Sequence, residues 1–135
     1  MARVMLDTNT CIYALKNDPP EVRRRLTVLT PGSIALSSLV VAELWHGIAK
    51  SSRRARNIAA LQEFLENLAV LDWPAGAAPI YGEIRASLER EGRLIGGTNM
   101  LIAAHAIYEG AILITRNLGE FRRVSGLRVQ NWVKS

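Results

Sequence analysis

The sequence predicts an α/β fold: one three-layer α/β/α domain built on a parallel sheet of about five strands. Short apolar runs alternate with longer amphipathic stretches along the chain, and such strand–helix alternation favours a parallel sheet covered on both faces. The 135 residues suit a single domain, spanning 1–135, that buries about two-thirds of its unfolded surface. No linker, repeat or low-complexity segment interrupts the pattern.

The first half of the chain contains two predicted strands. The apolar run 3–6 ends at Asp7, and the run 33–37 follows a Thr-Pro-Gly turn. Helices are predicted over 8–16 and 20–29, because Pro20 is tolerated in a first helical turn. A further helix is expected to be capped by Ser38 and to run through Lys50.

The second half continues the alternation. An amphipathic helix is predicted over 53–68, with Ile58, Leu61, Leu65 and Leu68 at helical spacing. Strand 69–72 and helix 74–90 follow, and Gly92 closes that helix. A very apolar helix, capped by Thr98 and ending near Gly110, precedes strands over 111–115 and 127–132.

Composition restricts the partners and the compartment. The net charge of +5, carried by 14 Arg and 3 Lys, favours a polyanion such as nucleic acid, although an Arg-rich composition also arises from a GC-rich genome. The single Cys11 allows no internal disulfide. No apolar run approaches the roughly 18 residues of a membrane span, and the first residues lack a signal-peptide pattern, so we expect a cytoplasmic protein with no membrane partner.

Three polar residues occupy positions that need an explanation. Asp7 directly follows the first strand, where it is either a helix N-cap or a site residue. Glu43 lies in the apolar stretch SLVVAELWHGI, where an ionised carboxylate needs a salt bridge, a raised pKa or a metal ion. Asn99 follows Gly96-Gly97 at a predicted helix start, where a capping role is the simpler interpretation.

Other chemistry-bearing residues have plainer interpretations. His46 could share a helix face with Glu43, but no second Glu-x-x-His pair supports a metal role. His105 is predicted to be a hydrogen-bonded core histidine, and the three tryptophans to pack in the core or an interface. The pairs Arg53-Arg54 and Arg122-Arg123 are predicted to be solvated, with a phosphate track as the alternative.

Four ordered segments resemble the PIN-domain family, specifically the VapC toxins of type II toxin–antitoxin modules. They are MLDTNTCIYALK, ALSSLVVAELWHGIAKS, LIGGTNMLIAAHA and ILITRNLGEF, and the closing RVSGLRVQNW is also similar. No single segment is specific. Together they cover nearly the whole chain in the family's order.

The resemblance implies an acidic pocket that binds Mg²⁺ or Mn²⁺ and cuts single-stranded regions of RNA, often tRNA or rRNA loops. Asp7, Glu43 and Asn99 match the three metal-binding positions, and Asn117 matches a fourth catalytic position. Supporting roles fall on Asn9, Ser38, Thr115 and Glu120. The resemblance also implies a homodimer and a VapB-type antitoxin.

This chemistry suits the residues, because hard oxygen ligands hold Mg²⁺, which activates water and neutralises charge on phosphate. Asn99 departs from the family pattern, which has Asp at this position. An amide oxygen brings no charge and cannot act as a base, so we expect weak metal binding and reduced activity. The residue is interpreted as an introduced inactivating substitution or as the mark of a degenerate toxin.

Two other functions stay open at this point, and a third is disfavoured. The chain could be a catalytically inactive RNA- or antitoxin-binding module, or a PIN-type nuclease that acts on DNA. A receiver-like signalling domain is disfavoured, because Asp7 has no acidic neighbour and no Lys closely follows Thr115.

Overall fold

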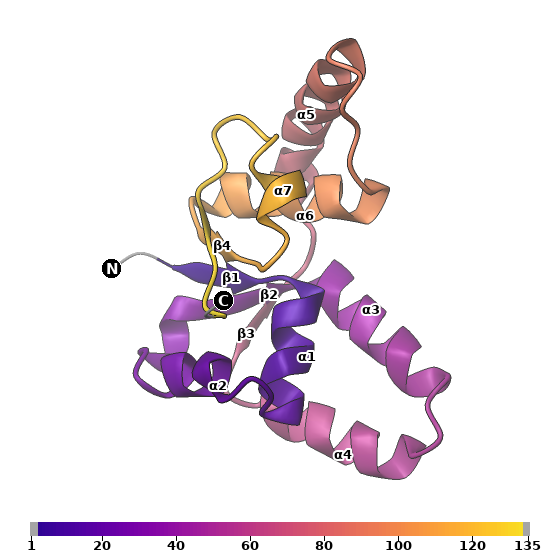
Figure 1. The fold of residues 1–135 in the computed structure, drawn as a ribbon, viewed down its shortest axis with the longest axis vertical. Coiled ribbons are helices and arrows are strands. Elements are labelled where there is room, and N and C mark those ends of the chain that lie inside the picture. Colours follow the sequence, from indigo (N-terminus) through magenta and orange to yellow (C-terminus); the bar gives the residue numbers. More distant parts are fainter. Residues whose placement is uncertain (1–2, 134–135) are drawn as a thin grey trace.

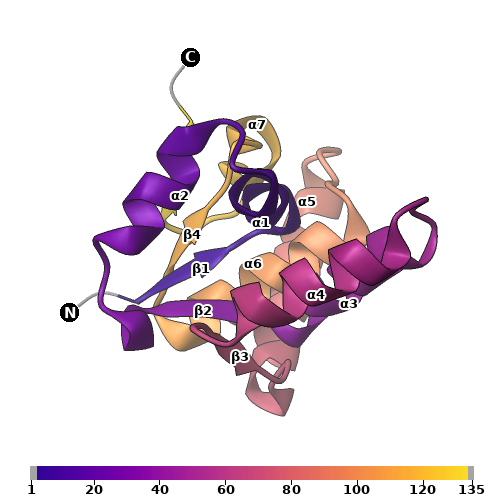
Figure 2. The same ribbon diagram turned by 90° about the horizontal axis from the view of Figure 1, so that it is seen from below.

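The computed structural model describes residues 3–133, and its centre is a five-stranded parallel sheet. The strands lie in the order β3-β2-β1-β4-β5, as predicted for a parallel sheet of about five strands. Their bounds are β1 Val4–Leu6, β2 Ile34–Ser37, β3 Ala69–Leu71, β4 Ile112–Ile114 and β5 Val129–Gln130. Figure 2 shows β2, β1 and β4 side by side. The predicted termini 1–2 and 134–135 of the domain lie outside the described residues.

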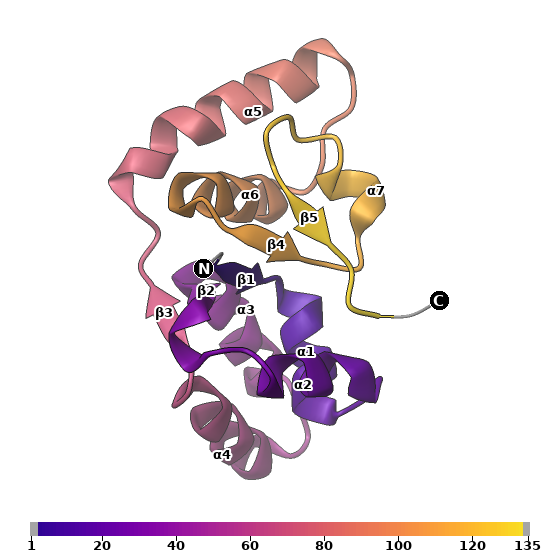
Figure 3. The same ribbon diagram turned by 90° about the vertical axis from the view of Figure 1, so that its left-hand side faces the viewer.

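Helices form a layer on each side of this sheet. Helices α1, α2 and α4 lie on one side and α5 and α6 on the other, with α3 beside the sheet between them (Figures 1 and 3). Their bounds are α1 Thr8–Lys16, α2 Pro20–Thr27, α3 Ser38–Ala49, α4 Arg54–Leu65, α5 Ala78–Arg90, α6 Gly97–Glu109 and α7 Leu118–Phe121. Two short 3₁₀ turns cover Pro31–Ser33 and Ala75–Ala77.

The core lies between the central strands and these helices. Every residue of β1 and β2 is buried, because both faces of a parallel sheet are covered, and the strands therefore show no alternation. Helix α6 buries six residues in the layer above the sheet. Within residues 3–133, no helix is both long and apolar enough to span a membrane.

Element types agree with the sequence, whereas several helix ends differ. Ser37, not Ser38, caps α3: its hydroxyl accepts a hydrogen bond from the Leu39 amide. Thr98 lies inside α6, which begins after Gly96 without a side-chain cap. The four-residue helix α7 was not predicted, because one helical turn has too little periodicity to be recognised.

A candidate metal centre at the carboxyl edge of the sheet

The parallel register brings distant segments together at one edge of the sheet. Leu6 pairs with Ile114, so Asp7 and Thr115 follow neighbouring strands directly, and Ser37 ends the strand on the other side of β1. The Asp7 amide extends this pairing by donating to the Ile114 carbonyl at 3.1 Å. Ligand sites of open parallel sheets form beyond such carboxyl ends.

Asp7 is both a buried carboxylate and the N-cap of α1. Its side chain is 5% exposed, and Oδ1 accepts a hydrogen bond from the Thr10 amide at 2.9 Å. The capping interpretation is therefore confirmed. It does not exclude a site role, since the cap uses one carboxylate oxygen and a helix N-terminus stabilises negative charge.

Glu43 lies on α3 and reaches toward the start of α1. Thr8, beside Asp7, donates its hydroxyl proton to Glu43 Oε1. The expectation that Glu43 is surrounded by apolar groups is wrong, because this face of α3 points to solvent and the residue is exposed. The argument from burial cost therefore does not apply, and a hydrogen bond to the Asp7 segment is what connects Glu43 to this edge.

Asn99, Asn117 and Glu120 form a second cluster in which Glu120 is the common partner. Its Oε1 accepts hydrogen bonds from the Asn99 amide group at 3.5 Å and from the Gly96 backbone at 3.1 Å. Its Oε2 accepts one from the Asn117 amide group at 3.0 Å. Both Glu120 oxygens are thus held by donors from α6, from the preceding loop and from the start of α7.

These donors favour the ionised form of Glu120. The hydrogen bond from Asn117, followed by those from Gly96 and Asn99, lowers the pKa of the Glu120 carboxyl below its ordinary value. Asn117 also caps α7, with Oδ1 accepting from the Glu120 amide at 3.4 Å. The Asn-x-x-Glu spacing resembles a capping box. This spacing is the sequence signal that could have identified Glu120 as a central residue of the cluster rather than a supporting one.

The two clusters are connected by the neighbouring strands β1 and β4, which precede Asp7 and Thr115. Asp7 follows β1 and Thr115 follows β4, and the Thr115 hydroxyl accepts the Asn117 backbone N–H at 2.9 Å. The structure therefore brings Asp7 with Glu43, and Asn99 with Asn117 and Glu120, to the same edge of the sheet.

The other predicted residues lie in more ordinary places. Ser38 accepts a hydrogen bond from the Trp73 amide at 3.1 Å and so ties α3 to the segment after β3. Asn9 is exposed in the first turn of α1, and His46 is exposed on α3. His105 is fully buried as predicted, but the expected hydrogen bond is absent: neither ring nitrogen has a partner among residues 3–133.

The tryptophans differ from one another in burial, and so do the two arginines of the pair 122–123. Trp132 is buried and Trp73 is half-buried, whereas Trp45 is 38% exposed on α3. Arg122 is solvated as predicted. Arg123 is not, because it is half-buried and donates to backbone carbonyls.

The candidate ligands are of the type that a hard divalent cation binds, but they carry too little negative charge. Asp7, Glu43 and Asn99 offer carboxylate and amide oxygens, the ligand types that Mg²⁺ and Mn²⁺ take. In the described part of the chain, no three His, Cys, Asp or Glu side chains are grouped so that they could hold a metal ion. At position 99 an amide nitrogen donates to Glu120, in the place where a third acid would contribute charge.

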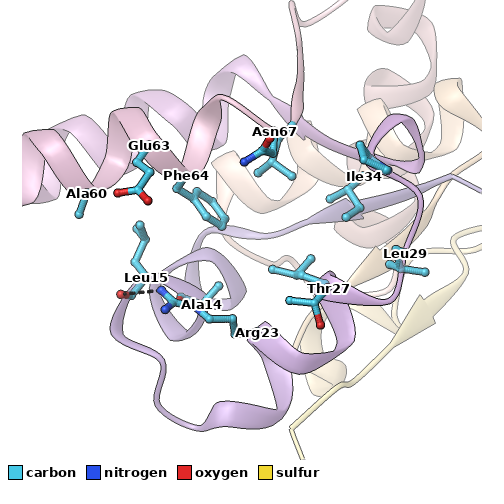
Figure 4. A pocket seen from close by; sticks show the side chains of 13 residues that line it. Ala14, Leu15, Arg23, Thr27, Leu29, Ile34, Ala60, Glu63, Phe64 and Asn67 are labelled. Carbon is cyan, nitrogen blue, oxygen red and sulfur yellow. Dashed lines mark hydrogen bonds between the residues drawn. The ribbon is translucent and has the colours of Figure 1, made fainter.

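One hollow of the surface lies away from this edge. A pocket of about 470 Å³ is formed by α1, α2 and α4 and is lined mostly by apolar side chains, with Arg23 and Glu63 among them (Figure 4). None of the clustered carboxylates and amides lines it. Glu63 is the single carboxylate in its lining, too few for a metal site, so the candidate metal centre stays at the sheet edge.

Comparison with known proteins assigns the family. The PIN-domain family matches residues 4–127. Ribonuclease VapC2 of Rickettsia felis is 43% identical over 131 residues, covering 96% of this chain and 98% of that protein. The tRNA(fMet)-specific endonuclease VapC of Shigella flexneri is 44% identical, covering 98% and 99%. The DNA-bound VapBC structure from Salmonella typhimurium superposes with a TM-score of 0.92 at 41% identity, covering 98% of this chain and all of that one. The chain therefore belongs to the PIN-domain family and, within it, to the VapC ribonucleases.

Proposed function

We propose that this chain is a metal-dependent endoribonuclease toxin of a type II toxin–antitoxin module, with its activity reduced by Asn99. The observation that supports the proposal is the placement of two polar pairs, Asp7 with Glu43 and Asn99 with Glu120, at segments that follow the neighbouring strands β1 and β4. The substrate is the single-stranded part of an RNA, in a tRNA or rRNA loop. The Shigella relative, named for tRNA(fMet), makes initiator tRNA the first substrate to test.

Asp7, Glu43 and Asn99 would hold Mg²⁺ or Mn²⁺. When bound, the ion lowers the pKa of a coordinated water and neutralises charge on the phosphate. Thr8 orients the Glu43 carboxylate, and the Thr10 amide fixes that of Asp7. Asn99 can orient an oxygen but supplies neither negative charge nor a basic group.

A second function is favoured by one specific contact. The Asn99 amide group donates to Glu120 at 3.5 Å, so a neutral donor faces this carboxylate where a third acid would need a cation between them. The chain as it stands would then act as an RNA- or antitoxin-binding module that does not cut.

Partners follow from the relatives. The solved relatives from Rickettsia felis and Salmonella typhimurium are VapBC assemblies, which supports a VapB-type antitoxin as the partner of this chain. We propose a homodimer as well, with which the exposed Trp45 on α3 is compatible. Sedimentation of the chain alone measures its oligomeric state, and sedimentation with a VapB protein measures antitoxin binding.

The test compares this chain with Asn99→Asp on initiator tRNA and rRNA fragments, with Mn²⁺ or with EDTA, and maps cleaved ends by sequencing. Asn99→Asp should cut only with Mn²⁺, and this chain far more slowly. Asp7→Asn in the Asn99→Asp background controls for contaminating nuclease. No Mn²⁺-dependent cleavage by Asn99→Asp would reject the nuclease, and calorimetric RNA binding without metal would then support the binding module.

A further inference from the structure

Arg123 differs from every other arginine near the candidate metal centre. Its guanidinium Nη1 donates to the carbonyl oxygens of Arg93 at 3.3 Å and Leu94 at 3.2 Å. Its Nε is buried and has no hydrogen-bond partner within residues 3–133. Burying part of an arginine without full pairing costs free energy, so the position calls for an explanation beyond solubility. The neighbouring Arg122 is exposed and serves as a natural comparison.

The carbonyls that Arg123 contacts belong to the loop between α5 and α6. Residues 91–94 of this loop are exposed and have no regular structure, whereas Ile95 is buried. The loop passes α7 on its way into α6 (Figure 3). Its first residues are held by backbone hydrogen bonds to the end of α5, from the Gly92 amide to the Glu89 carbonyl at 3.1 Å and from the Arg93 amide to the Leu88 carbonyl at 2.9 Å. Beyond Arg93, the loop is held by the burial of Ile95 and by the side chains of Arg123 and Glu120.

Arg123 and Glu120 bind the middle and the end of this loop, and they do so with opposite charges. They are three residues apart, spanning the end of α7. The cation takes the carbonyls of Arg93 and Leu94, and the anion takes the Gly96 N–H at 3.1 Å. The carbonyl oxygens therefore accept from a cationic donor, and the N–H donates to an anionic acceptor, which are the stronger charge-assisted hydrogen bonds.

The loop decides where α6 begins. Gly96 precedes the helix without a side-chain cap, and its carbonyl accepts the Met100 amide at 3.0 Å. Asn99 lies in that first turn and donates to Glu120. A displacement of residues 93–96 would thus change both the Gly96–Glu120 hydrogen bond and the orientation of Asn99.

We propose that Arg123 is a positioning residue of the candidate metal centre: its hold on the Arg93 and Leu94 carbonyls fixes the loop, and through it Gly96 and Asn99 against Glu120. Arg123 touches neither substrate nor metal in this role. Its effect on catalysis rests on the proposed nuclease function, whereas its effect on Gly96 does not.

The experiment compares Arg123→Ala with Arg122→Ala, which removes the same charge one residue away. The first measurement is amide hydrogen exchange of Gly96 by NMR in the metal-free chain. Arg123→Ala should lower the protection of the Gly96 amide about tenfold, while Arg122→Ala leaves it within about twofold. Arg123→Lys keeps a donor for the carbonyls and should restore part of the protection.

The second measurement repeats these changes in the Asn99→Asp background. Loss of a group that supports metal ligands typically costs about 10–100-fold in metal affinity or activity. We expect a loss of this size in Mn²⁺ affinity and in kcat for Arg123→Ala, with KM for RNA little changed.

Two results would overturn the proposal. One is equal Gly96 protection in Arg123→Ala and Arg122→Ala. If the alanine variant does not fold, Arg123→Met and Arg122→Met, which keep a long side chain but no donor, give the same comparison. The other is a rise in KM alone with Gly96 unaffected, which would make Arg123 a phosphate contact. An inactive Asn99→Asp protein would count against the proposed function, while Gly96 exchange still tests the positioning role.

Discussion

Replacing Asn99 by Asp should make the stability of this chain depend on divalent metal. The Asn99 amide nitrogen lies 3.5 Å from Glu120 Oε1, and the substitution puts a carboxylate oxygen in its place. Two unit charges at that distance repel by about 1 kcal/mol at the dielectric constant of water and by about 5 kcal/mol at an effective value near 20. Both side chains are partly solvated, so we expect a cost of about 1–2 kcal/mol.

The assay is urea denaturation of both chains, in EDTA and in Mn²⁺. In EDTA, Asn99→Asp should be less stable by that amount. In Mn²⁺ the order should reverse, because a ligand at 100 times its Kd adds about 2.7 kcal/mol to the state that binds it. Gln62→Glu, the same amide-to-acid change at an exposed position of α4, should show neither effect. Equal stabilities in EDTA and equal shifts in Mn²⁺ would refute the placement of position 99 beside Glu120.

Three further predictions follow from single contacts. Burial lowers the pKa of His105, so the unfolded chain binds the proton more tightly than the folded one, and the free energy of unfolding should be full above about pH 6.5 and fall at lower pH. Urea denaturation at pH 7 and pH 5 should therefore show a smaller loss of stability for His105→Leu than for the unchanged chain. An equal loss in both would contradict the assignment to His105. Thr8→Val removes the donor to Glu43 and should slow RNA cleavage by the Asn99→Asp form about tenfold with little loss of stability; unchanged kinetics would argue against this orienting role. Trp73→Phe removes the indole hydrogen bond to the Leu101 carbonyl, 2.9 Å in length, and should lower the free energy of unfolding by about 1 kcal/mol, measured by the same denaturation; no change would mean that the bond contributes nothing net.

The parts of the fold that could be predicted are those with a strong local signal. The buried strands that end before Asp7 and before Thr115 are short apolar runs, and strand–helix alternation predicts that they belong to one parallel sheet. That they are neighbours in register, Leu6 with Ile114, comes from the structure alone. Asp7 could be assigned to this edge because a polar residue directly after a buried strand has few other places to lie.

The parts that could not be predicted depend on tertiary contacts. The exposure of Glu43 depends on which face of α3 the neighbouring helices cover, and the local sequence is apolar on most faces. The partial burial of Arg123 depends on a loop that is distant in sequence. Glu120 holds Asn99 and Gly96 across the start of α6, which the Asn117-x-x-Glu120 spacing alone does not reveal.

The adjacency of β1 and β4 has a consequence for when this protein can act during its synthesis. Asp7 leaves the ribosome well before the segment from Thr115 to Glu120, which lies about 110 residues further along the chain. β4 must pair with β1 before the two segments meet, and a parallel pairing of strands so distant in sequence forms late. A nascent chain that has not yet added β4 therefore lacks half of this edge, so the proposed cleavage can begin only after the segment through Glu120 has been translated and β4 has paired with β1.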